Sequence, residues 1–458
     1  MMKTKIIALL GLCITMVSCK DFLALKPETS YSHPESLEDI NALLNYESRV
    51  NGNYLGNIES GTDDFEIDFS SYSTRSAYYQ ELYRWDEEPF SEDGGAGENW
   101  LFPYETILYA NVALESLERV KGGEPSLRKR LEGDALFIRS YRFFQLLQVY
   151  SPPYLVGDQD SPYGIPLRLS SNVNEPSVRA TVKEGYGQII DDLNKSIQLL
   201  PEEVNYKTRP NKSSAYALLA RVQLSIGDYE NALKNAHQSL QRNSKLLDYN
   251  SMDLSAAYPF MPLNQEVIYH GKSSASGSLM ASSRLTITQD LLSMYSDDDL
   301  RKTAFFVART PDRFRFKGFY NGSAASYFAG IAVDEMMLIA AECHIRTGKV
   351  GEGMEMLNSL LANRYDRITF VPRTASNELE ALRIVLDERR KELPFRGIRW
   401  TDLRRLNRDP RFAKTIRRSF PVEDDKPMET ILLPEDPRYC YYIPPQVIEK
   451  SGMVQTKR

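Results

Sequence analysis

Apolar residues recur at helical spacing along three long stretches of the chain, residues 104–120, 127–150 and 183–200. A period of about 3.6 residues places such positions on one face of a helix, with charged positions opposite. The second stretch is apolar on most sides, which predicts a helix buried around most of its circumference. Pro152 and Pro201 follow the last two stretches, and proline cannot continue a helix. The pattern predicts a mainly α-helical protein.

Small residues mark two helix–turn–helix pairs further along the chain. In each pair three small residues are spaced by seven and then five positions: Ala220, Gly227 and Ala232, and again Ala341, Gly348 and Gly353. The outer two let the helices approach closely, and the middle glycine ends the first helix in a left-handed conformation. This spacing resembles tetratricopeptide repeats. The copies lie 121 residues apart, so they are not consecutive units of a regular array.

The stretches between these helices have a different composition. Residues 51–100 are polar, aromatic and rich in Gly and Asp, and residues 245–330 are rich in Ser, Tyr, Pro and Gly. Residues 406–442 carry Pro, Asp and Arg. They predict long ordered loops with a few short strands. Long loops on a rigid scaffold commonly carry binding function.

The first 18 residues have the pattern of a secretory signal. Lys3 and Lys5 precede a 12-residue apolar run, which is shorter than the roughly 20 residues that a membrane-spanning helix needs. The small residues before Cys19 resemble a bacterial lipobox, so we expect removal of residues 1–18 and a lipid anchor on Cys19. Secretion without lipid is the alternative.

Composition excludes several function classes. The 56 Lys and Arg residues nearly balance 62 Asp and Glu residues, and losing Lys3 and Lys5 lowers the net charge from −6 by two, to −8. Nothing here favours nucleic-acid binding. With four His and four Cys, a multi-ligand zinc or iron–sulfur site is hard to build, so we expect no metal and no cofactor. Cys343 and Cys440 could form a disulfide, but the helical surroundings of Cys343 favour a buried thiol.

No catalytic motif is present in the sequence. It contains no G-x-S-x-G elbow, phosphate loop, H-E-x-x-H or dinucleotide fingerprint, so we expect no enzyme. A glycosidase would need only two acids that can lie far apart in the chain, so spacing does not test that class. The acidic residues 61–68 could ligate calcium, but they lack EF-hand spacing, and a polar loop is the favoured interpretation.

Aromatic residues cluster in two of the predicted loops. Aromatic rings stack on the apolar faces of sugar rings or on peptide side chains, while nearby polar groups bind hydroxyls or amides. Packing inside the protein is the alternative for each ring. The candidate ligand-binding residues are Tyr78, Tyr79, Trp85, Tyr320 and Tyr327.

Five segments together resemble the SusD/RagB family of Bacteroidetes outer-membrane lipoproteins. The most specific is residues 388–405, where E-R-R-K-E-L is followed by R-W-T-D-L-R-R; their alternating charges predict two helices joined by ion pairs. The other four follow in family order: C-K-D-F-L with K-P at residues 19–27, W…Y…I…N at 100–111, the helix 135–146, and Y-I-P…E at 442–449. The resemblance covers nearly the whole chain.

The resemblance implies a SusD-like fold, with tetratricopeptide-like helix pairs and a loop-rich portion. It also implies a lipid-anchored protein exposed on the outer membrane, which captures an oligosaccharide for a SusC-like TonB-dependent transporter. A peptide ligand, as in RagB-like members, is the first alternative. A lipid-anchored hydrolase and a purely structural interaction protein are the others. The expected regions are a signal peptide (1–18), a lipidated segment (19–35), an N-terminal helical region (36–245) and a C-terminal SusD/RagB region (246–458).

Overall fold

The computed structural model describes residues 34–52, 54, 56–87, 96–274, 279–421 and 427–458. The predicted signal peptide and Cys19 lie outside these residues. None of the described helices is long and apolar enough to cross a membrane.

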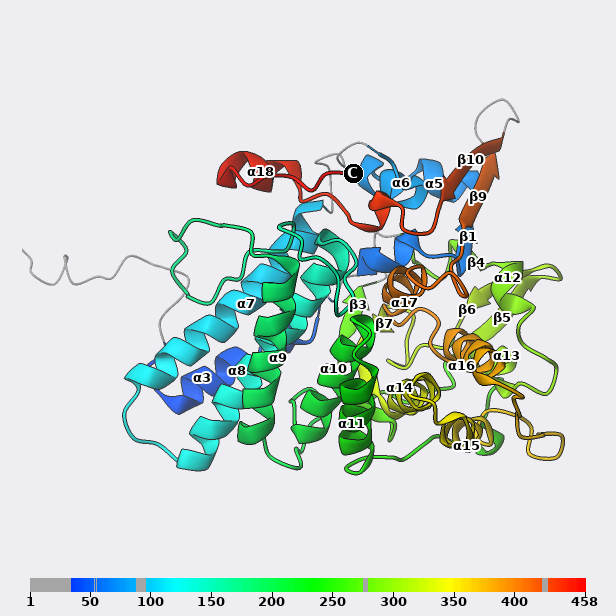
Figure 1. Ribbon diagram of the computed structural model, residues 1–458, viewed down its shortest axis with the longest axis horizontal. Coiled ribbons are helices and arrows are strands. Elements are labelled where there is room, and N and C mark those ends of the chain that lie inside the picture. Colours follow the sequence, from blue (N-terminus) through cyan, green and yellow to red (C-terminus); the bar gives the residue numbers. More distant parts are fainter. Residues whose placement is uncertain (1–33, 53, 55, 88–95, 275–278, 422–426) are drawn as a thin grey trace, which may run out of the picture.

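A row of packed helices forms the body of the protein (Figure 1). In order, they are α7 (Ala96–Arg119), α8 (Pro125–Tyr150), α9 (Val182–Leu199), α10 (Lys212–Ser225), α11 (Tyr229–Leu240), α14 (Val333–Arg346), α15 (Val350–Leu361) and α16 (Glu378–Glu392). From α7 to α15 each helix packs against the next, and α16 packs against both α14 and α15. The three stretches of helical periodicity correspond to α7, α8 and α9, so that prediction is confirmed.

The two helix–turn–helix pairs are α10–α11 and α14–α15. Their middle glycines, Gly227 and Gly348, have φ of 75° and 82°, the left-handed turn that the spacing predicts. At Gly353 a Cβ atom would lie 2.5 Å from the Ile345 side chain, so only glycine allows this approach of the helices. Helix α11 packs against α14, so the pairs are neighbours in space although 121 residues separate them in sequence.

Two short helices cover the beginning of the row. Helix α3 (Leu37–Leu44) packs on α7 and α8, and α4 (Glu47–Val50) packs on α7. Ser36 and Asp39 form a capping box, in which each side chain accepts a hydrogen bond from the other residue's backbone N–H.

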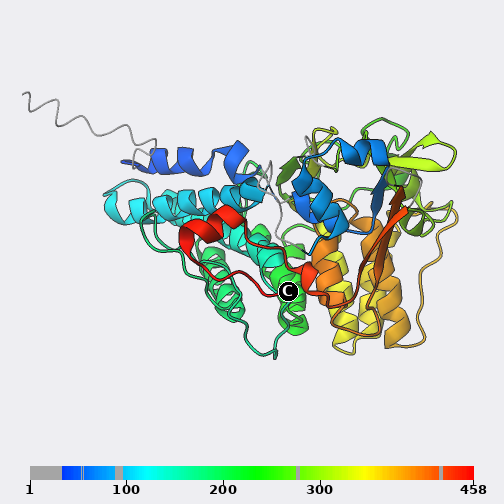
Figure 2. The same cartoon turned by 90° about the horizontal axis from the view of Figure 1, so that it is seen from above.

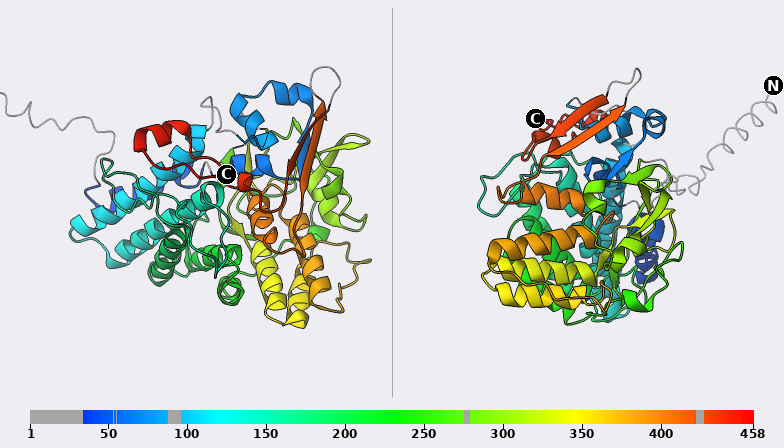
Figure 3. Two further views of the ribbon diagram at one scale, coloured as in Figure 1. Left: turned by 45° about the horizontal axis from the view of Figure 1, so that its top comes forward. Right: turned by 90° about the vertical axis from the view of Figure 1, so that its right-hand side faces the viewer.

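The loop-rich portion is built from short elements that come from distant parts of the chain. In the described residues its strands form five two-stranded antiparallel sheets: β1 (Phe65–Ile67) with β4 (Leu285–Ile287), β2 (Val267–Tyr269) with β8 (Ile331–Ala332), β3 (Lys272–Ser274) with β7 (Ser326–Phe328), β5 (Phe306–Thr310) with β6 (Arg313–Phe316), and β9 (Ile416–Pro421) with β10 (Pro427–Leu432). The short helices are η2 (Gly56–Gly61), α5 (Phe69–Ser73), α6 (Ala77–Arg84), η3 (Tyr249–Ser251), α12 (Gln289–Leu292), α13 (Leu300–Phe305), α17 (Arg399–Leu406), η4 (Pro437–Tyr439) and α18 (Pro445–Ser451). Figure 3 shows the β9–β10 hairpin projecting from this portion.

Two hydrophobic clusters hold the molecule together. The larger one fills the helix row and includes residues from α3 to the C-terminal segment, and the smaller one is an aromatic core under the short strands. Phe395 lies in the aromatic core and contacts Phe65, Phe316 and Tyr327. Strands from residues 65–67 and 285–287 therefore share one core, which explains how such short elements remain ordered.

The C-terminal segment returns from the loop-rich portion to the first helices (Figure 2). The backbone N–H of Tyr441 donates to the Val149 carbonyl at the end of α8. Arg179 donates to the Val454 carbonyl at 3.1 Å and to the Thr456 hydroxyl at 3.0 Å. Helix α18 is thereby placed beside α7.

Candidate functional site

Most charged side chains of the motif at residues 388–405 form buried ion pairs. Helix α16 carries its first half and α17 its second, so the prediction of two helices joined by ion pairs is confirmed. The partners in the first half are Arg301 and Lys391 for Glu388, Asp402 for Arg389, Asp63 and Asp64 for Arg390, Asp299 for Lys391, and Arg301 and Arg364 for Glu392. Those in the second half are Asp63 for Arg399 and Glu342 with Asp402 for Arg405. These side chains fasten helices to loops.

The acidic loop at residues 61–68 belongs to the same network. Asp63 pairs with Arg399 at 2.7 Å and with Lys414 at 2.9 Å, and Asp64 pairs with Arg390 at 2.8 Å. Although burial opposes ionisation, Arg399 and Arg390 hold the pKa of Asp63 well below its usual value. The protein's own cations thus occupy these carboxylates, which supports the polar-loop interpretation over calcium. Among the described residues, no group of three or more His, Cys, Asp or Glu side chains could hold a metal ion.

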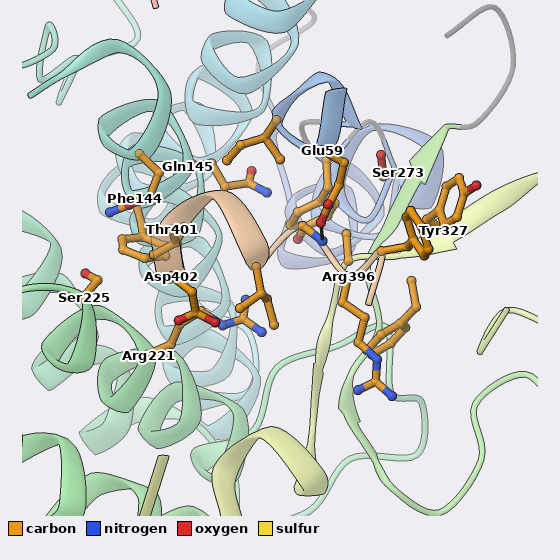
Figure 4. Close-up of a pocket in the computed structure, with 18 of the residues that line it drawn as sticks. Glu59, Phe144, Gln145, Arg221, Ser225, Ser273, Tyr327, Arg396, Thr401 and Asp402 are labelled. Carbon is orange, nitrogen blue, oxygen red and sulfur yellow. Dashed lines mark hydrogen bonds between the residues drawn. The ribbon is translucent and has the colours of Figure 1, made fainter. Parts of the chain in front are cut away.

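A small cavity lies where the helix row meets the loop-rich portion (Figure 4). Its volume is about 50 Å³. Gln145 on α8 and Arg221 on α10 line one side, while Glu59, Ser273 and Tyr327 come from the loops opposite. The cavity is well below the roughly 300 Å³ at which ligand pockets begin. The cavity therefore cannot enclose an oligosaccharide in this conformation.

Two carboxyl groups line this cavity, and both already have partners in the protein. Burial and the neighbouring Asp64 raise the pKa of Glu59 to about 8, and Glu59 accepts a hydrogen bond from the Gly397 N–H. Asp402 accepts from Arg389 and Arg405, each at 2.8 Å. A glycosidase needs two carboxyl groups with the scissile bond and water between them. Because the cavity is too small for that substrate and Asp402 is occupied by two arginines, the hydrolase alternative gains no support here.

A larger groove of about 570 Å³ lies between the first half of α7, the loop of residues 166–177 and α18. We call it the α7–α18 groove. Its aromatic lining consists of Trp100, Phe102 and Tyr104, and its volume falls in the range of small-ligand sites. Leu101 and Val173 on its rim are 60% and 71% exposed, so the rim adds apolar surface that a ligand could cover.

Polar groups hold the walls of the α7–α18 groove in place. The Tyr104 hydroxyl donates to the Pro166 carbonyl at 2.9 Å, and the Asn111 amide donates to the Arg168 carbonyl at 2.8 Å. Arg49 lies over the Phe102 ring at 5.2 Å and pairs with Glu105 at 3.3 Å. The groove therefore combines aromatic faces with a charged pair that can bind hydroxyl groups.

The five aromatic residues predicted to bind ligand lie in the loop-rich portion, but most are enclosed. Tyr78, Trp85 and Tyr320 are no more than 2% exposed, and Tyr327 is 5% exposed but lines the small cavity. Tyr79 is half-buried. Their contact with a ligand stays a prediction.

The enclosed rings have partners that explain their burial. Trp85 donates through Nε1 to the Gly61 carbonyl at 3.0 Å, and Tyr320 donates to Glu266 at 2.7 Å. Tyr78 accepts a hydrogen bond from the Asn99 amide at 3.1 Å.

The groove residues Phe102 and Arg168 carried no recognisable sequence signal, because a groove between distant segments is a tertiary feature.

The two remaining cysteines are buried free thiols, as the helical surroundings of Cys343 predicted. Burial raises the pKa of both thiols. Burial and the raised pKa both disfavour the reactive thiolate form of these two cysteines.

Comparisons with known proteins find one family at both ends of the chain. A family model described as "Starch-binding associating with outer membrane" matches residues 21–224, and the SusD family model matches residues 333–444. Together the two matches cover more than half of the chain. A search of curated proteins finds no match.

Solved structures with this fold have low sequence identity to the chain. A SusD superfamily protein from Bacteroides thetaiotaomicron is 20% identical, with a TM-score of 0.74 over 92% of this chain and 100% of its own. A SusD-like carbohydrate binding protein from Bacteroides vulgatus is 18% identical, with a TM-score of 0.68 over 92% and 97%. A laminarin binding SusD-like protein is also 18% identical, with a TM-score of 0.68 over 93% and 99%.

These likenesses confirm the predicted fold, a mainly helical SusD-like structure with few short strands. The family identity also confirms the expectation that the protein is not an enzyme. The chain belongs to the SusD/RagB family, whose members are binding proteins associated with the outer membrane.

Proposed function

We propose that this protein is a lipid-anchored receptor that captures an oligosaccharide at the cell surface and passes it to a SusC-like TonB-dependent transporter. The observation that carries the proposal is the match of both SusD family models, one of them described as starch-binding. A relative with the same fold is described as laminarin binding. Starch and laminarin are both carbohydrates, so a sugar ligand is favoured over a peptide.

The α7–α18 groove is the ligand site that the geometry supports best. It has the volume for several sugar units and an aromatic lining, and the Arg49–Glu105 pair supplies a hydrogen-bond donor and acceptor beside Phe102. Sugar recognition uses this combination, because rings stack on the apolar faces of pyranoses while charged groups bind hydroxyls.

A second candidate surface is the one predicted from the aromatic loops. Of its five residues, Tyr79 has the exposure to meet a ligand directly. Tyr78, Trp85, Tyr320 and Tyr327 would act beneath it, by supporting the loops.

A glycan-binding screen of residues 20–458, followed by three variants, tests the function and both sites. If the groove binds sugar, Phe102→Ala weakens binding by about two- to tenfold, the value of one aromatic stack. Tyr79→Ala tests the second surface in the same way. Tyr206→Ala is the matched control, because Tyr206 is 70% exposed and lines neither site. A screen without any glycan ligand refutes the sugar assignment and shifts the proposal to peptides.

The transporter partnership is tested separately. The full chain, with its lipid on Cys19, is recovered from native outer membranes by affinity purification under mild detergent. We expect a TonB-dependent barrel protein to co-purify. Recovery of the lipoprotein without such a partner would contradict the transfer step, even if glycan binding is found.

A further inference from the structure

A pocket outside both candidate ligand surfaces lies beside the C-terminal tail, residues 453–458. It has a volume of about 280 Å³ and is lined by Tyr163 from the loop after α8, by Arg408 just after α17 and by Lys457 of the tail. A second recess, of about 310 Å³, shares Pro152 and Arg408 with it, so the two adjoin. We call the two recesses together the tail pocket. Each is close to the roughly 300 Å³ at which small-ligand sites begin.

Two arginines hold the walls of the tail pocket in place. Arg404 on α17 is 2% exposed and donates to the Tyr439 carbonyl at 2.7 Å. Arg179 donates to the Tyr163 carbonyl at 2.6 Å and to the Thr456 hydroxyl at 3.0 Å. Nε of Arg404 makes no hydrogen bond to any described residue, although buried polar groups normally have a partner. The walls are therefore fixed before a ligand arrives, which lowers the entropic cost of binding.

The rim of the tail pocket carries a strained residue. Glu435 has a φ of 59°, a left-handed conformation that residues other than glycine rarely adopt. It is the third residue of a turn in which the Asp436 N–H donates to the Leu433 carbonyl at 3.2 Å. Arg408 pairs with Glu435 at 2.8 Å and with Asp158 at 3.0 Å, and thereby joins the loop after β10 to the loop after α8. Strained residues of this kind gather at binding and catalytic sites.

We propose that the tail pocket is a second carbohydrate site, which binds one or two units of a neutral sugar. The inference rests on the proposed function, because it adds a site for the same class of ligand. Sugar hydroxyls both donate and accept hydrogen bonds, and the tail pocket offers both kinds of partner: Arg408 and Lys457 donate, while Glu435 and Asp158 accept. Three cationic and three acidic side chains line it, so a charged ligand gains little over a neutral one.

Flat apolar side chains complete the tail pocket. Tyr154, Tyr163, Pro152 and Pro153 line it and are half-buried, so part of each ring is accessible. Tyr154 stacks on Tyr186 with the ring centres 5.7 Å apart, which fixes its orientation. Such rings pack against the apolar faces of pyranoses.

The tail pocket lies close to the α7–α18 groove along the chain. Met453 lines the groove, whereas Thr456 and Lys457 line the tail pocket. Three residues of extended chain span at most about 11 Å. One polysaccharide held at both places would bind more tightly than at either alone, because the second contact forms within the same complex.

Calorimetry and crystallography on residues 20–458 test the second site. The probes are maltotriose, laminaritriose and xylotriose, which are neutral trisaccharides. We expect at least one of them to bind at two sites per chain, and a crystal soaked with it to show sugar in the tail pocket as well as in the α7–α18 groove. Phe102→Ala should weaken the groove site and leave the tail-pocket site unchanged.

Two exposed residues of the tail pocket provide the variants. Glu435→Ala and Lys457→Met should each weaken the tail-pocket site by about three- to tenfold, the value of one hydrogen bond, and leave the groove site unchanged. Glu230→Ala is the matched control, because Glu230 is an exposed acid on α11 that lines neither site. Circular dichroism checks the folding of each variant.

The outcomes separate the second site from the proposed function. Sugar in the groove alone overturns the second site and leaves the proposed function intact, and so does sugar in the soaked tail pocket without a second site in calorimetry. A second site that is unchanged in both Glu435→Ala and Lys457→Met also overturns the assignment. If no probe binds at either site, the second site and the sugar assignment both fail.

Discussion

Replacing Arg301 by methionine should destabilise the protein more than any surface substitution, because Arg301 neutralises three buried carboxylates. Its guanidinium donates to Asp299 through Nε and Nη2, each at 2.8 Å, to Glu392 at 3.0 Å and to Glu388 at 2.5 Å. Arg301 and Glu392 are both fully buried. Methionine keeps most of the volume but removes all four charge-assisted hydrogen bonds.

The expected loss in the free energy of unfolding follows from the partners that the three carboxylates keep after the substitution. Asp299 keeps Lys391, Glu388 keeps Lys391 and Tyr365, and Glu392 keeps Arg364. The carboxylates are under-compensated rather than isolated, and removing one partner of a buried ion pair costs about 3–5 kcal/mol. With a urea m-value of about 3 kcal/mol/M, the unfolding midpoint should fall by about 1 to 1.7 M.

Urea unfolding at two pH values tests this reasoning. In Arg301→Met the uncompensated carboxylates have raised pKa values in the folded state, so they regain protons and the deficit is smaller at pH 5 than at pH 8. Arg309→Met is the control, since Arg309 is exposed and forms no ion pair with any residue that the structure describes. A deficit below about 1 kcal/mol, or one equal to that of Arg309→Met, refutes the role assigned to Arg301.

Three further predictions address other parts of the molecule. Because the pKa of folded Glu59 is about 8 against an ordinary 4.5, the folded state holds the extra proton between these values, and stability falls by up to about 1.4 kcal/mol per unit as pH rises through this window. Glu59→Gln should remove this slope in thermal unfolding from pH 5 to 8, whereas Glu118→Gln on the exposed surface should retain it. Gly353→Ala places a Cβ atom 2.5 Å from Ile345 and 2.7 Å from the Ala341 carbonyl, so denaturant unfolding should show a loss of about 1–3 kcal/mol; Gly351→Ala, which meets nothing within 4 Å, should be neutral or stabilising. Cys19→Ser should abolish metabolic labelling with a fatty acid and release the protein from the membrane, and labelling that persists in this variant excludes Cys19 as the anchor.

The helices were predictable from sequence because their information is local. Apolar period and proline ends located α7, α8 and α9, and the positions of Gly227 and Gly348 located the turns of both pairs. The packing of α11 on α14 was not predictable in this way. It depends on the loop-rich residues 241–332, which leave the helix row and return to it, and no local pattern records where such a chain returns.

In the aromatic loops, unlike in the helices, the burial of individual side chains could not be predicted from sequence. Their composition indicated rings available to a ligand, yet Trp85 and Tyr320 are enclosed and hydrogen-bonded. A short helix and strands of three residues have no interpretable period, so the buried and exposed faces of residues 65–85 could not be separated. Strand β1 pairs with β4, more than 200 residues later, and both strands belong to the aromatic core that buries Tyr320, whereas Trp85 is buried in the larger cluster.

The motif at residues 388–405, which resembles the family most specifically, stabilises the fold. Glu388, Arg389, Arg390, Lys391 and Glu392 all have buried partners, which are Asp299, Arg301, Arg364, Asp402 and the acidic loop near residue 63. Because these side chains are buried and ion-paired, the motif can identify the fold without direct contact with what is bound. We therefore expect the residues that determine ligand specificity to lie outside the motif. The α7–α18 groove, which we propose as the ligand site, is lined by no residue of the motif, and Tyr79 also lies outside it.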